Sequence, residues 1–378
     1  MAPLFSILIP TRNRGHLLDY ALRSALNQTF DDYEIIVSDN DSQDDTRSVV
    51  DRLRNSKVQY VKTPKMLPMT ESWEFALSHA RGEWITVLCD DSALLASSLE
   101  AIAGAVRNAS TQVIAWPNAE YYHPSWPRPE DINHLKFWPF ADATTSINSK
   151  AALKKLYNTL SIGLNLPSIH KGICHRKLLD GIKAQGKSMF LTFSPDYSSS
   201  AVLLFFSENY LYIDTPFTVM GYAKESIGES AAKDRGKAIQ DFVKEFSGDT
   251  FTHTPLKLHT LKNYIAETLL RTREAFGQTI DIHWDTYYYN LHNDLLVLQK
   301  NGVNVEADRK ALLEYLTNLK HPLAGYLENN SITDPPGTPS LSIRGEDENF
   351  HDILEAASYL EQYGKIVSKQ KRLVGHES

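Results

Sequence analysis

Residues 5–39 read FSILIPTRNRGHLLDYALRSALNQTFDDYEIIVSD, and the order of apolar and polar residues in this stretch decides the fold. The apolar run Phe5–Ile9 ends at a proline, and leucines at helical spacing follow it within Leu17–Gln28. A second apolar run, Tyr33–Val37, comes next. Short apolar runs bounded by breakers are typical of buried strands, whereas apolar residues three or four positions apart indicate a helix. The stretch therefore predicts a strand, a helix and a second strand.

The same alternation continues toward the middle of the chain. Val58–Val61 is a short apolar run, Glu71–Ala80 has helical periodicity, and Trp84–Leu88 is a further apolar run. Strands that alternate with helices form a parallel sheet through right-handed crossovers. We therefore expect an α/β fold with a mostly parallel sheet flanked by helices.

Polar side chains follow three of the predicted strands at the point where each strand ends. They are Thr11, Asp39 and the pair Asp90-Asp91. In sheets of this kind, ligands bind beyond the carboxyl ends of the strands. The sequence therefore predicts that these side chains converge on one crevice.

The composition restricts the class of protein. The chain has 378 residues, of which 42% are hydrophobic, and its formal net charge of -7 excludes a general attraction for nucleic acid. Cys89 and Cys174 match no zinc or redox spacing, which favours a reduced, cytoplasmic protein. The N-terminal stretch lacks a basic region and a cleavage site, and we find no apolar run long enough to span a bilayer. We expect a soluble or peripheral protein.

Two later segments lack a regular pattern. Residues 116–139 are rich in Trp, Tyr, Pro and His without a sustained period, and we interpret them as an irregular surface insertion. Lys224–Lys237, KESIGESAAKDRGK, combines glycine, serine and alternating charge, and we interpret it as a mobile loop or linker. Between them, Pro195–Leu204 is expected to form a helix.

The last third of the chain has helical periodicity in four segments. These are Leu256–Phe276, Trp284–Lys300, Ala307–Leu319 and Phe350–Val367. We therefore divide the chain into residues 1–110, residues 111–236 and a C-terminal α-helical extension, residues 237–378.

The segment GEWITVLCDDSALL, residues 82–95, has the clearest chemical pattern. Two adjacent carboxylates after a buried strand repel one another, an arrangement that a hard divalent cation such as Mg²⁺ or Mn²⁺ stabilises when it bridges them to a phosphate. A helix N-cap beside a solvated aspartate is the alternative reading of the pair Asp90-Asp91.

The stretch quoted first, together with ALSHARGEWITVLCDDSALL, resembles the donor half of the inverting glycosyltransferases of family 2, which have the GT-A fold. The resemblance covers residues 4–110 and weakens toward residue 230. It implies that residues 1–110 are a donor-binding half and residues 111–236 an acceptor-binding half. It implies that Pro10, Thr11 and Arg12 belong to the loop that binds the nucleotide, and that Asp39 hydrogen-bonds its base or ribose.

The resemblance also assigns the acidic residues after the fourth strand. Asp91 aligns with the metal-binding aspartate of the family. Asp90, the residue before it, is implied to bind the same metal and the cofactor. Two positions depart from the family pattern, because Cys89 and Ser92 replace acidic residues. Fewer carboxylates imply a weaker cation site, so we expect Mn²⁺ or Mg²⁺ to bind together with the diphosphate.

Asp196, in the segment TFSPDYSSS, occupies the position where the family has its catalytic base. Transfer by a single displacement requires a group that removes the proton of the acceptor hydroxyl, and a carboxylate can do so. An N-cap is the alternative role for this residue. His170, Lys171 and the pair His175-Arg176 are further candidates for contacts with phosphate or acceptor. Aromatic residues that could stack on sugars or pack in the fold are Trp116, Tyr121, Tyr122, Trp126 and Trp138.

The resemblance thus implies a metal-dependent glycosyltransferase that moves a sugar from a nucleoside diphosphate sugar, with UDP-sugar favoured, to a saccharide or glycolipid acceptor in polysaccharide biosynthesis. A non-catalytic binding or scaffold protein on this fold is one alternative. A nucleotidyltransferase is another, although TRNRG supplies only part of the glycine-rich basic loop it would need. A dehydrogenase is disfavoured, because no G-x-G-x-x-G follows the first strand.

The helical third leaves two roles open. Its apolar faces, such as Leu291, Leu295 and Leu298, must be covered by the rest of the chain or by a second copy, so a homo-oligomer and an acceptor platform are both compatible with the sequence. The terminal segment VSKQKRLVG, residues 367–375, adds positive charge that could attract an anionic membrane, and a solvated helix end is the simpler reading.

Overall fold

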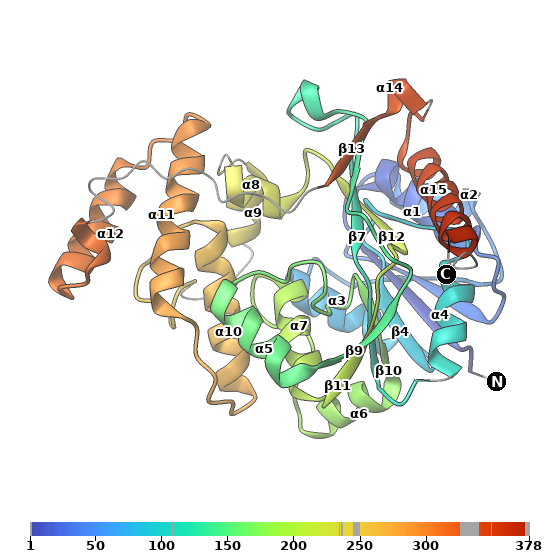
Figure 1. Ribbon diagram of the computed structural model, residues 1–378, viewed down its shortest axis with the longest axis horizontal. Coiled ribbons are helices and arrows are strands. Elements are labelled where there is room, and N and C mark those ends of the chain that lie inside the picture. Colours follow the sequence, from blue (N-terminus) through green and yellow to red (C-terminus); the bar gives the residue numbers. More distant parts are fainter. Residues whose placement is uncertain are drawn as a thin grey trace.

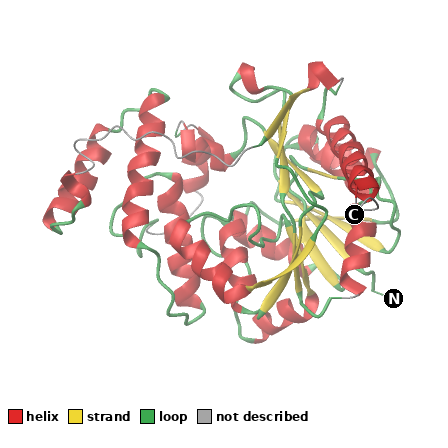
Figure 2. Cartoon of the chain, in the orientation of Figure 1, coloured by secondary structure: helices red, strands yellow, loops and turns green. Residues whose placement is uncertain are grey.

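The computed structural model describes residues 2–107, 109–233, 235, 237–244, 250–325, 340–348 and 350–374. Two β-sheets form the centre of the molecule, helices cover the larger sheet, and part of the C-terminal helical region extends to one side (Figures 1 and 2). The expected α/β fold with a C-terminal helical region is confirmed.

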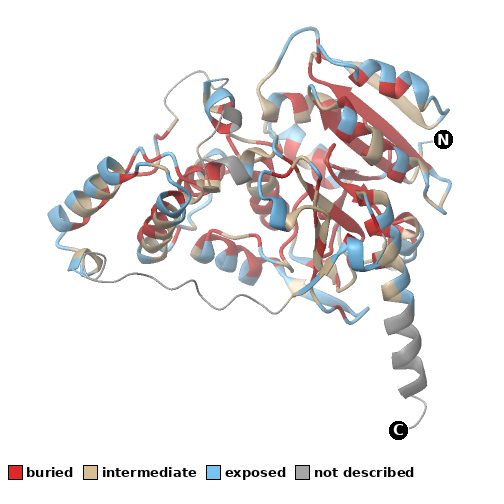
Figure 3. Ribbon diagram, turned by 90° about the horizontal axis from the view of Figure 1, so that it is seen from above, coloured by how far each residue is buried: buried red, intermediate tan, exposed pale blue. Residues whose placement is uncertain are grey.

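The larger sheet has the strand order β3-β2-β1-β4-β10-β6-β11-β9. Its first four strands are β1 (Phe5–Thr11), β2 (Tyr33–Asp39), β3 (Val58–Lys62) and β4 (Trp84–Val87). They run parallel and are connected by the helices α1 (Gly15–Leu26), α2 (Thr46–Arg52) and α3 (Met69–Ser78). Every residue of β1, β2 and β4 is buried, because helices cover both faces of this part of the sheet. The burial view shows these strands as a continuous buried layer (Figure 3).

The second half of the larger sheet is mixed. Its strands are β6 (Val113–Ala115), β9 (Thr144–Asn148), β10 (Gly172–His175) and β11 (Asn209–Ile213). β10 is antiparallel to both β4 and β6, whereas β11 is parallel to β6 and antiparallel to β9. The accompanying helices are α4 (Ser98–Arg107), α5 (Ser149–Thr159), α6 (Arg176–Ala184) and α7 (Pro195–Phe205). The parallel arrangement predicted from the strand and helix alternation therefore holds for the first four strands.

A second sheet corrects the expectation of an irregular insertion at residues 116–139. Its order is β13-β8-β7-β12-β5. The strands are β5 (Ala93–Leu94), β7 (Asn118–Tyr122), β8 (His134–Phe137), β12 (Thr218–Tyr222) and β13 (Leu341–Arg344). A short 3-10 turn, η1 (Pro129–Asp131), lies between β7 and β8, and α14 (Gly345–Glu348) follows β13. The strands within residues 116–139 were missed because they are short and their partners β12 and β13 lie far away in sequence.

The expected mobile loop at Lys224–Lys237 is also corrected. The structure forms α8 (Ile227–Lys233) there, and α9 (Lys237–Lys244) begins at its end, while Asp234 and Gly236 lie outside the described residues. Ala231 of α8 is buried in a small apolar cluster with Phe242 and Phe193. This packing stabilises a helix where the composition alone suggested a linker.

The helical region divides into two parts on opposite sides of the molecule (Figure 1). On one side, α10 (Leu261–Ala275) packs on α7 and α11 (Trp284–Lys300), and α11 packs on α12 (Glu306–Asn318). On the other side, α15 (Ile353–Val374) contacts α1, β5 and β12. Leu291, Leu295 and Leu298 are buried within the chain, so these apolar faces need no second copy to cover them.

No helix among the described residues combines the length and the hydropathy that crossing a membrane requires.

Candidate active site

All of the predicted site residues except Asp39 meet in a cavity of about 870 Å³ at the carboxyl ends of β1 and β4. Pro10, Thr11 and Arg12 come from β1 and the loop after it, and Asp90 and Asp91 follow β4. The first turn of α7 adds Asp196, and further wall is supplied by β12, α8, α9 and α10. Three segments that are far apart in sequence therefore line one space.

Side chains of the next loop along the sheet hold the loop after β1 in place. Asn13 has a φ of 54°, a left-handed conformation that asparagine tolerates better than most residues. Its amide donates to Ser42 Oγ at 2.9 Å, and its side-chain oxygen accepts from the amide of Gln43 at 2.8 Å. Asp44 accepts from the amide of Gly15 at 2.9 Å. These bonds position the loop at the mouth of the cavity without using Thr11.

Thr11 itself has an unused polar group. The residue is only 4% exposed, and its hydroxyl oxygen is buried without a hydrogen-bond partner among the described residues. A buried hydroxyl without a partner costs free energy unless a ligand or water satisfies it. Thr11 lines the cavity, so this hydroxyl is suited to bind a polar ligand there.

The backbone at Asp91 is held by two contacts from the second sheet. His123 Nε2 lies 2.9 Å from the carbonyl oxygen of Asp91. A Cβ built on Gly221 would lie 1.8 Å from the same oxygen, so only glycine allows β12 to approach so closely. Burial lowers the pKa of His123, which keeps its imidazole neutral near pH 7. The backbone turn at Asp91 is therefore held in place by groups that carry no charge.

The two aspartate carboxylates share one cationic neighbour. Arg14 Nη1 lies 3.1 Å from Asp90 Oδ1 and 3.9 Å from Asp91 Oδ2. Burial and the neighbouring Asp90 raise the pKa of Asp91 to about 7, whereas Arg14 acts in the opposite direction. Burial acts to lower the pKa of Arg14, but the two carboxylates hold it above its ordinary value, so its guanidinium stays charged.

Cys89 and Ser92 are the two residues that depart from the family pattern. Burial, followed by the charges of Asp91, Asp90 and Asp196, raises the pKa of the Cys89 thiol well above its ordinary value, so Cys89 is neutral and a poor ligand for a hard cation. Ser92 Oγ donates to Asp91 Oδ1 at 3.1 Å. Ser92 thus orients the carboxylate that an acidic residue at this position would repel.

Asp196 lies in the first turn of α7, which begins at Pro195. Ser194 is the N-cap residue of this helix and makes no side-chain capping bond, so Asp196 is not the N-cap. Burial raises the pKa of Asp196 to about 6, although nearby backbone amides and Lys171 act in the opposite direction. A carboxylate with this pKa is ionised at neutral pH and basic enough to accept a proton.

The histidine and lysine candidates lie in different places. His170 lines the cavity, and Lys171 is buried with its ammonium donating to the carbonyl of Gly163. Burial lowers the pKa of Lys171 to about 7, while Asp196 acts to raise it. His175 instead accepts from the amide of Lys177 as the N-cap of α6.

Arg176, beside His175, donates to the carbonyl of Gly82 at 2.8 Å, at the opposite edge of the sheet where β4 begins. The pair His175-Arg176 is thus not part of the cavity.

Asp39 is nearer to the core than the sequence suggested. It is 1% exposed and does not belong to the residues that line the cavity. One carboxylate oxygen accepts from the amide of Ser42 at 2.7 Å, and the other accepts from the Tyr60 hydroxyl at 2.5 Å. In this structure Asp39 holds the turn after β2, and a contact to a nucleoside would use its remaining lone pairs.

The aromatic candidates mostly pack within the protein. Trp116, Tyr121 and Trp126 are buried. Tyr222, which the sequence did not single out, lines the cavity and stacks on Tyr122 with ring centroids 5.2 Å apart. Other cavity residues missed from the sequence are Arg14, Asn40, Trp73, Phe193 and Tyr264. Arg14 was within reach of sequence reasoning because it shares the loop with Thr11, but the others depend on contacts between distant elements.

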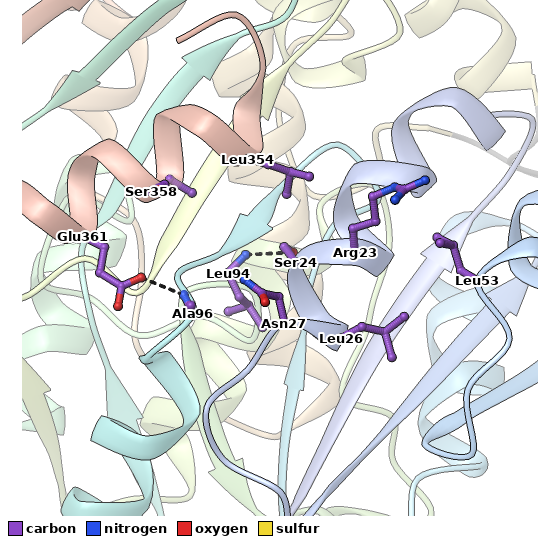
Figure 4. Close-up of a pocket in the computed structure, with 11 residues that line it drawn as sticks. Arg23, Ser24, Leu26, Asn27, Leu53, Leu94, Ala96, Leu354, Ser358 and Glu361 are labelled. Carbon is purple, nitrogen blue, oxygen red and sulfur yellow. Dashed lines mark hydrogen bonds between the residues drawn. The ribbon is translucent and has the colours of Figure 1, made fainter. Parts of the chain in front are cut away.

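A second cavity, of about 470 Å³, lies between α15 and the helix and strand that it covers, α1 and β5 (Figure 4). Glu361 of α15 accepts a hydrogen bond from the amide of Ala96 at 3.1 Å, and Ser24 accepts one from the amide of Leu94. Leu354, Leu53 and Leu26 form apolar parts of its wall. None of the predicted site residues lines this cavity.

Comparisons with known proteins match the N-terminal region. Residues 6–179 match the model of the family "Glycosyl transferase family 2". Over 104 residues the chain is 40% identical to the GalNAc(5)-diNAcBac-PP-undecaprenol beta-1,3-glucosyltransferase of Campylobacter jejuni, a stretch that covers 26% of this chain and 33% of the relative.

A second relative is UDP-Glc:alpha-D-GlcNAc-diphosphoundecaprenol beta-1,3-glucosyltransferase WfgD of Escherichia coli. It is 31% identical over 97 residues, which cover 26% of this chain and 38% of the relative. The chain thus matches well under half of the length of these two relatives. Among solved structures, S. aureus TarS in complex with UDP-GlcNAc has a TM-score of 0.47 and 15% identity, with 87% of each chain covered.

Proposed function

Because residues 6–179 match the model of glycosyl transferase family 2, we propose that the protein is an inverting glycosyltransferase that uses a nucleoside diphosphate sugar. The acceptor is the hydroxyl of a saccharide or glycolipid. The observation that carries this proposal is the convergence of Thr11, the Asp90-Asp91 pair and Asp196 on one cavity. A donor site and a general base must lie within one substrate length of each other for direct transfer.

Asp196 is proposed to act as the base. Its carboxylate would take the proton of the acceptor hydroxyl while the hydroxyl oxygen bonds to the anomeric carbon. The bond from that carbon to the diphosphate breaks, and the electron pair leaves with the diphosphate oxygen. A single displacement of this kind inverts the configuration at the anomeric carbon. The raised pKa of Asp196, about 6, supports the role because the group is ionised yet still accepts protons effectively at neutral pH.

A divalent cation fits this site only in part. Asp90 and Asp91 offer hard carboxylate oxygens, which suit Mg²⁺ or Mn²⁺. In the part of the chain that the structure describes, no group of three His, Cys, Asp or Glu residues is arranged to hold a metal. The remaining ligands would come from the diphosphate and water, so we propose that the cation binds together with the donor. When bound, it would neutralise charge on the leaving diphosphate.

The nucleotide would bind against the loop after β1. Thr11 supplies the buried hydroxyl without a partner, and Pro10 and Arg12 flank it at the cavity wall. Asp39 does not line the cavity. It is proposed to hold the turn that positions this loop, or to accept a hydrogen bond from the nucleoside through its remaining lone pairs. A UDP-sugar is the favoured donor, because the E. coli relative carries UDP-Glc in its name.

The acceptor would bind on the side of the cavity formed by the helices. Phe193, Ile239, Phe242, Tyr264 and Ile265 line this part of the cavity and make it largely apolar. Aromatic and aliphatic surfaces suit sugar faces and lipid chains. The named relatives act on diphosphoundecaprenol-linked saccharides, which supports a lipid-linked saccharide as the acceptor class.

Such an acceptor would place the protein at the inner face of a membrane as a peripheral, cytoplasmic enzyme of polysaccharide biosynthesis. The basic residues at the end of α15 could aid this contact, although the side chains after Lys365 lie outside the described residues. A homo-oligomer is not required by the buried leucines, but Val297 and Leu319, which are 37% and 51% exposed, leave apolar side chains of the helical region for contact with a second copy.

A panel of nucleotides, tested by thermal shift with and without Mn²⁺, examines the proposal directly. A ligand at 100 times its dissociation constant stabilises a protein by about 2.7 kcal/mol. Stabilisation by UDP only in the presence of Mn²⁺ is the expected result. A transfer assay with UDP-glucose and a lipid-linked saccharide, followed by NMR of the anomeric proton, then tests inversion. Retention of configuration would contradict the proposed single displacement.

A second function is favoured by one observation, the incomplete ligand set around Asp91. A protein that binds nucleotide sugars without catalysis needs neither a metal nor a base. Binding of UDP without any effect of Mn²⁺, together with no transfer to any acceptor, would support this alternative.

A further inference from the structure

Arg14 occupies a central position that neither the sequence pattern nor the proposed reaction assigns. Its guanidinium bonds in two directions. Nη1 contacts Asp90 Oδ1 at 3.1 Å and faces Asp91, and Nη2 donates to the backbone carbonyl of Glu225 at 2.6 Å. The side chains of Arg14, Asp90 and Asp91 are 20%, 6% and 12% exposed, so water screens their charges only weakly.

These contacts place a resident cation at the two carboxylates where the proposed metal must bind. When both carboxylates are ionised, the guanidinium carries one positive charge against two negative ones, so one negative charge remains. A divalent cation would balance both carboxylates, but it would repel the guanidinium at this distance. The two cations therefore cannot both lie at the carboxylates at low cost.

The second bond of Arg14 connects this competition to a neighbouring segment. Glu225 follows β12 and precedes α8, and residues 224–228 line the mouth of the cavity. His16, on α1, approaches the Glu225 carboxylate at 3.9 Å. Movement of the guanidinium away from Asp90 would break or redirect its bond to the Glu225 carbonyl, which would loosen the segment.

We propose that Arg14 is a latch that competes with the divalent cation for Asp90 and Asp91 and joins them to residues 224–228. Binding of the cation displaces the guanidinium and frees the segment at the cavity mouth. The inference rests on the proposed function, because it presumes that a divalent cation binds at this pair. Arg14 is thus a positioning residue, since it acts through the carboxylates and the segment.

The first test measures Mn²⁺ binding without nucleotide, by the electron paramagnetic resonance signal of free Mn²⁺. Arg14→Gln should bind Mn²⁺ at least about tenfold more tightly than the native protein, because the competing charge is gone. Arg14→Lys keeps the charge and should stay near the native affinity. Arg23→Gln is the matched control for loss of one charge, since Arg23 pairs with Asp19 on the outer side of α1.

The second test uses the native protein, so it does not depend on how well a variant folds. Hydrogen–deuterium exchange of residues 222–228 is followed with Mn²⁺ alone, at a concentration above the dissociation constant that the first test measures, because the cation binds only weakly without the diphosphate. We expect at least a threefold faster exchange when Mn²⁺ is added. In Arg14→Gln the exchange should be fast already and unaffected by the metal.

Equal Mn²⁺ affinity of Arg14→Gln and the native protein would overturn the proposal, as would exchange that does not respond to Mn²⁺ in the native protein. Binding of UDP with Mn²⁺ to the native protein is measured in parallel. If that binding is found while Arg14→Gln leaves Mn²⁺ affinity unchanged, the latch fails and the proposed function stands. If no nucleotide binds while the Mn²⁺ competition is observed, the proposed function fails and the latch stands.

Discussion

The α-carbon of Gly221 faces the carbonyl oxygen of Asp91 so closely that an added Cβ would lie 1.8 Å from that oxygen. The same Cβ would lie 2.6 Å from His123 Nε2, the group that contacts this carbonyl at 2.9 Å. Asp91 therefore takes its place from the second sheet as well as from β4. The geometry of the acidic pair depends on a contact between residues 130 positions apart in the chain.

Gly221→Ala should displace the Asp91 turn and reduce metal-dependent UDP binding at least about tenfold, because backbone atoms must move to admit the methyl group. Calorimetry of UDP with Mn²⁺ measures the effect. Gly181→Ala, in α6, is the control, since a Cβ there meets nothing within 4 Å. Native affinity in Gly221→Ala would show that the close approach does not position the site.

Asp91→Ala should abolish the Mn²⁺ dependence of UDP binding and leave the fold intact. The side chain bonds Ser92 and faces Arg14, whereas the backbone contacts with His123 survive the substitution. Circular dichroism checks the fold, and calorimetry with and without Mn²⁺ checks the dependence. If the variant keeps the affinity and the metal dependence of the native protein, Asp91 is not a metal ligand.

Asp196→Asn should preserve UDP binding and slow transfer by about 100- to 10,000-fold, because the amide cannot accept the acceptor proton. This loss corresponds to roughly 3 to 5 kcal/mol of activation free energy. In the native enzyme, kcat/KM should fall as the pH drops below about 6, the pKa of Asp196, since only the ionised carboxylate acts as a base. If the variant turns over at the native rate, Asp196 is not the catalytic base.

The same substitution has an expected effect on stability. The folded pKa of about 6 lies above the ordinary 3.8, so the folded chain binds this proton more tightly than the unfolded chain does. Ionised Asp196 therefore destabilises the fold increasingly as the pH rises from about 4 to 6. Asp196→Asn should be more stable than the native protein by on the order of 3 kcal/mol at pH 7. The gain should vanish near pH 4 in urea denaturation.

Thr11→Val should weaken UDP binding about three- to tenfold without lowering the free energy of unfolding, because the buried hydroxyl has no partner among the described residues. Ser38→Ala is the control. Its hydroxyl is also buried without a described partner, but Ser38 does not line the cavity. Equal loss of affinity in both variants would argue against a direct contact at Thr11.

Glu267→Gln should destabilise the protein by on the order of 3 kcal/mol at pH 7. Burial acts to raise the pKa of Glu267, but the amides of residues 252–254 and the Arg271 guanidinium outweigh it and lower this pKa to about 2. The folded pKa lies below the ordinary 4.5, so this stabilisation is present above about pH 4.5 and is lost as the pH falls through about 2.

Denaturation by urea between pH 2 and pH 7 measures this difference. Glu274→Gln, on the same helix and 73% exposed, is the control and should change stability little. A pH-independent difference between Glu267→Gln and the native protein would mean that lost packing, and not charge, explains the effect.

Local patterns were sufficient to predict much of the fold. β1, β2 and β4 are nearly continuous apolar runs, because helices bury both of their faces, and such runs are recognisable without knowing their partners. The strand end before Asp90-Asp91 is also a local pattern, an apolar run followed by carboxylates. The role of Asp196 as a base was implied by the resemblance to the family and stays a prediction.

The second sheet could not be predicted in this way. β8 has four residues, and its outer partner β13 lies some 200 positions later in the chain. A short strand is stabilised by its neighbours rather than by its own residues, so its pattern is weak. Residues 227–233 were misread for the same reason, since burial of Ala231 in a cluster of distant aromatic residues outweighs the flexible composition of that segment.

The site shows the same division. The amino-acid order establishes which acidic residues end the strands, because strand ends are local features. It could not establish that Asp39 bonds Tyr60 and turns inward, or that Arg14 lies between Asp90 and Glu225. Those contacts join residues from 21 to 211 positions apart. They form only when the sheet and helices have packed, because close approach and burial, and not the residue types alone, determine which charged groups pair.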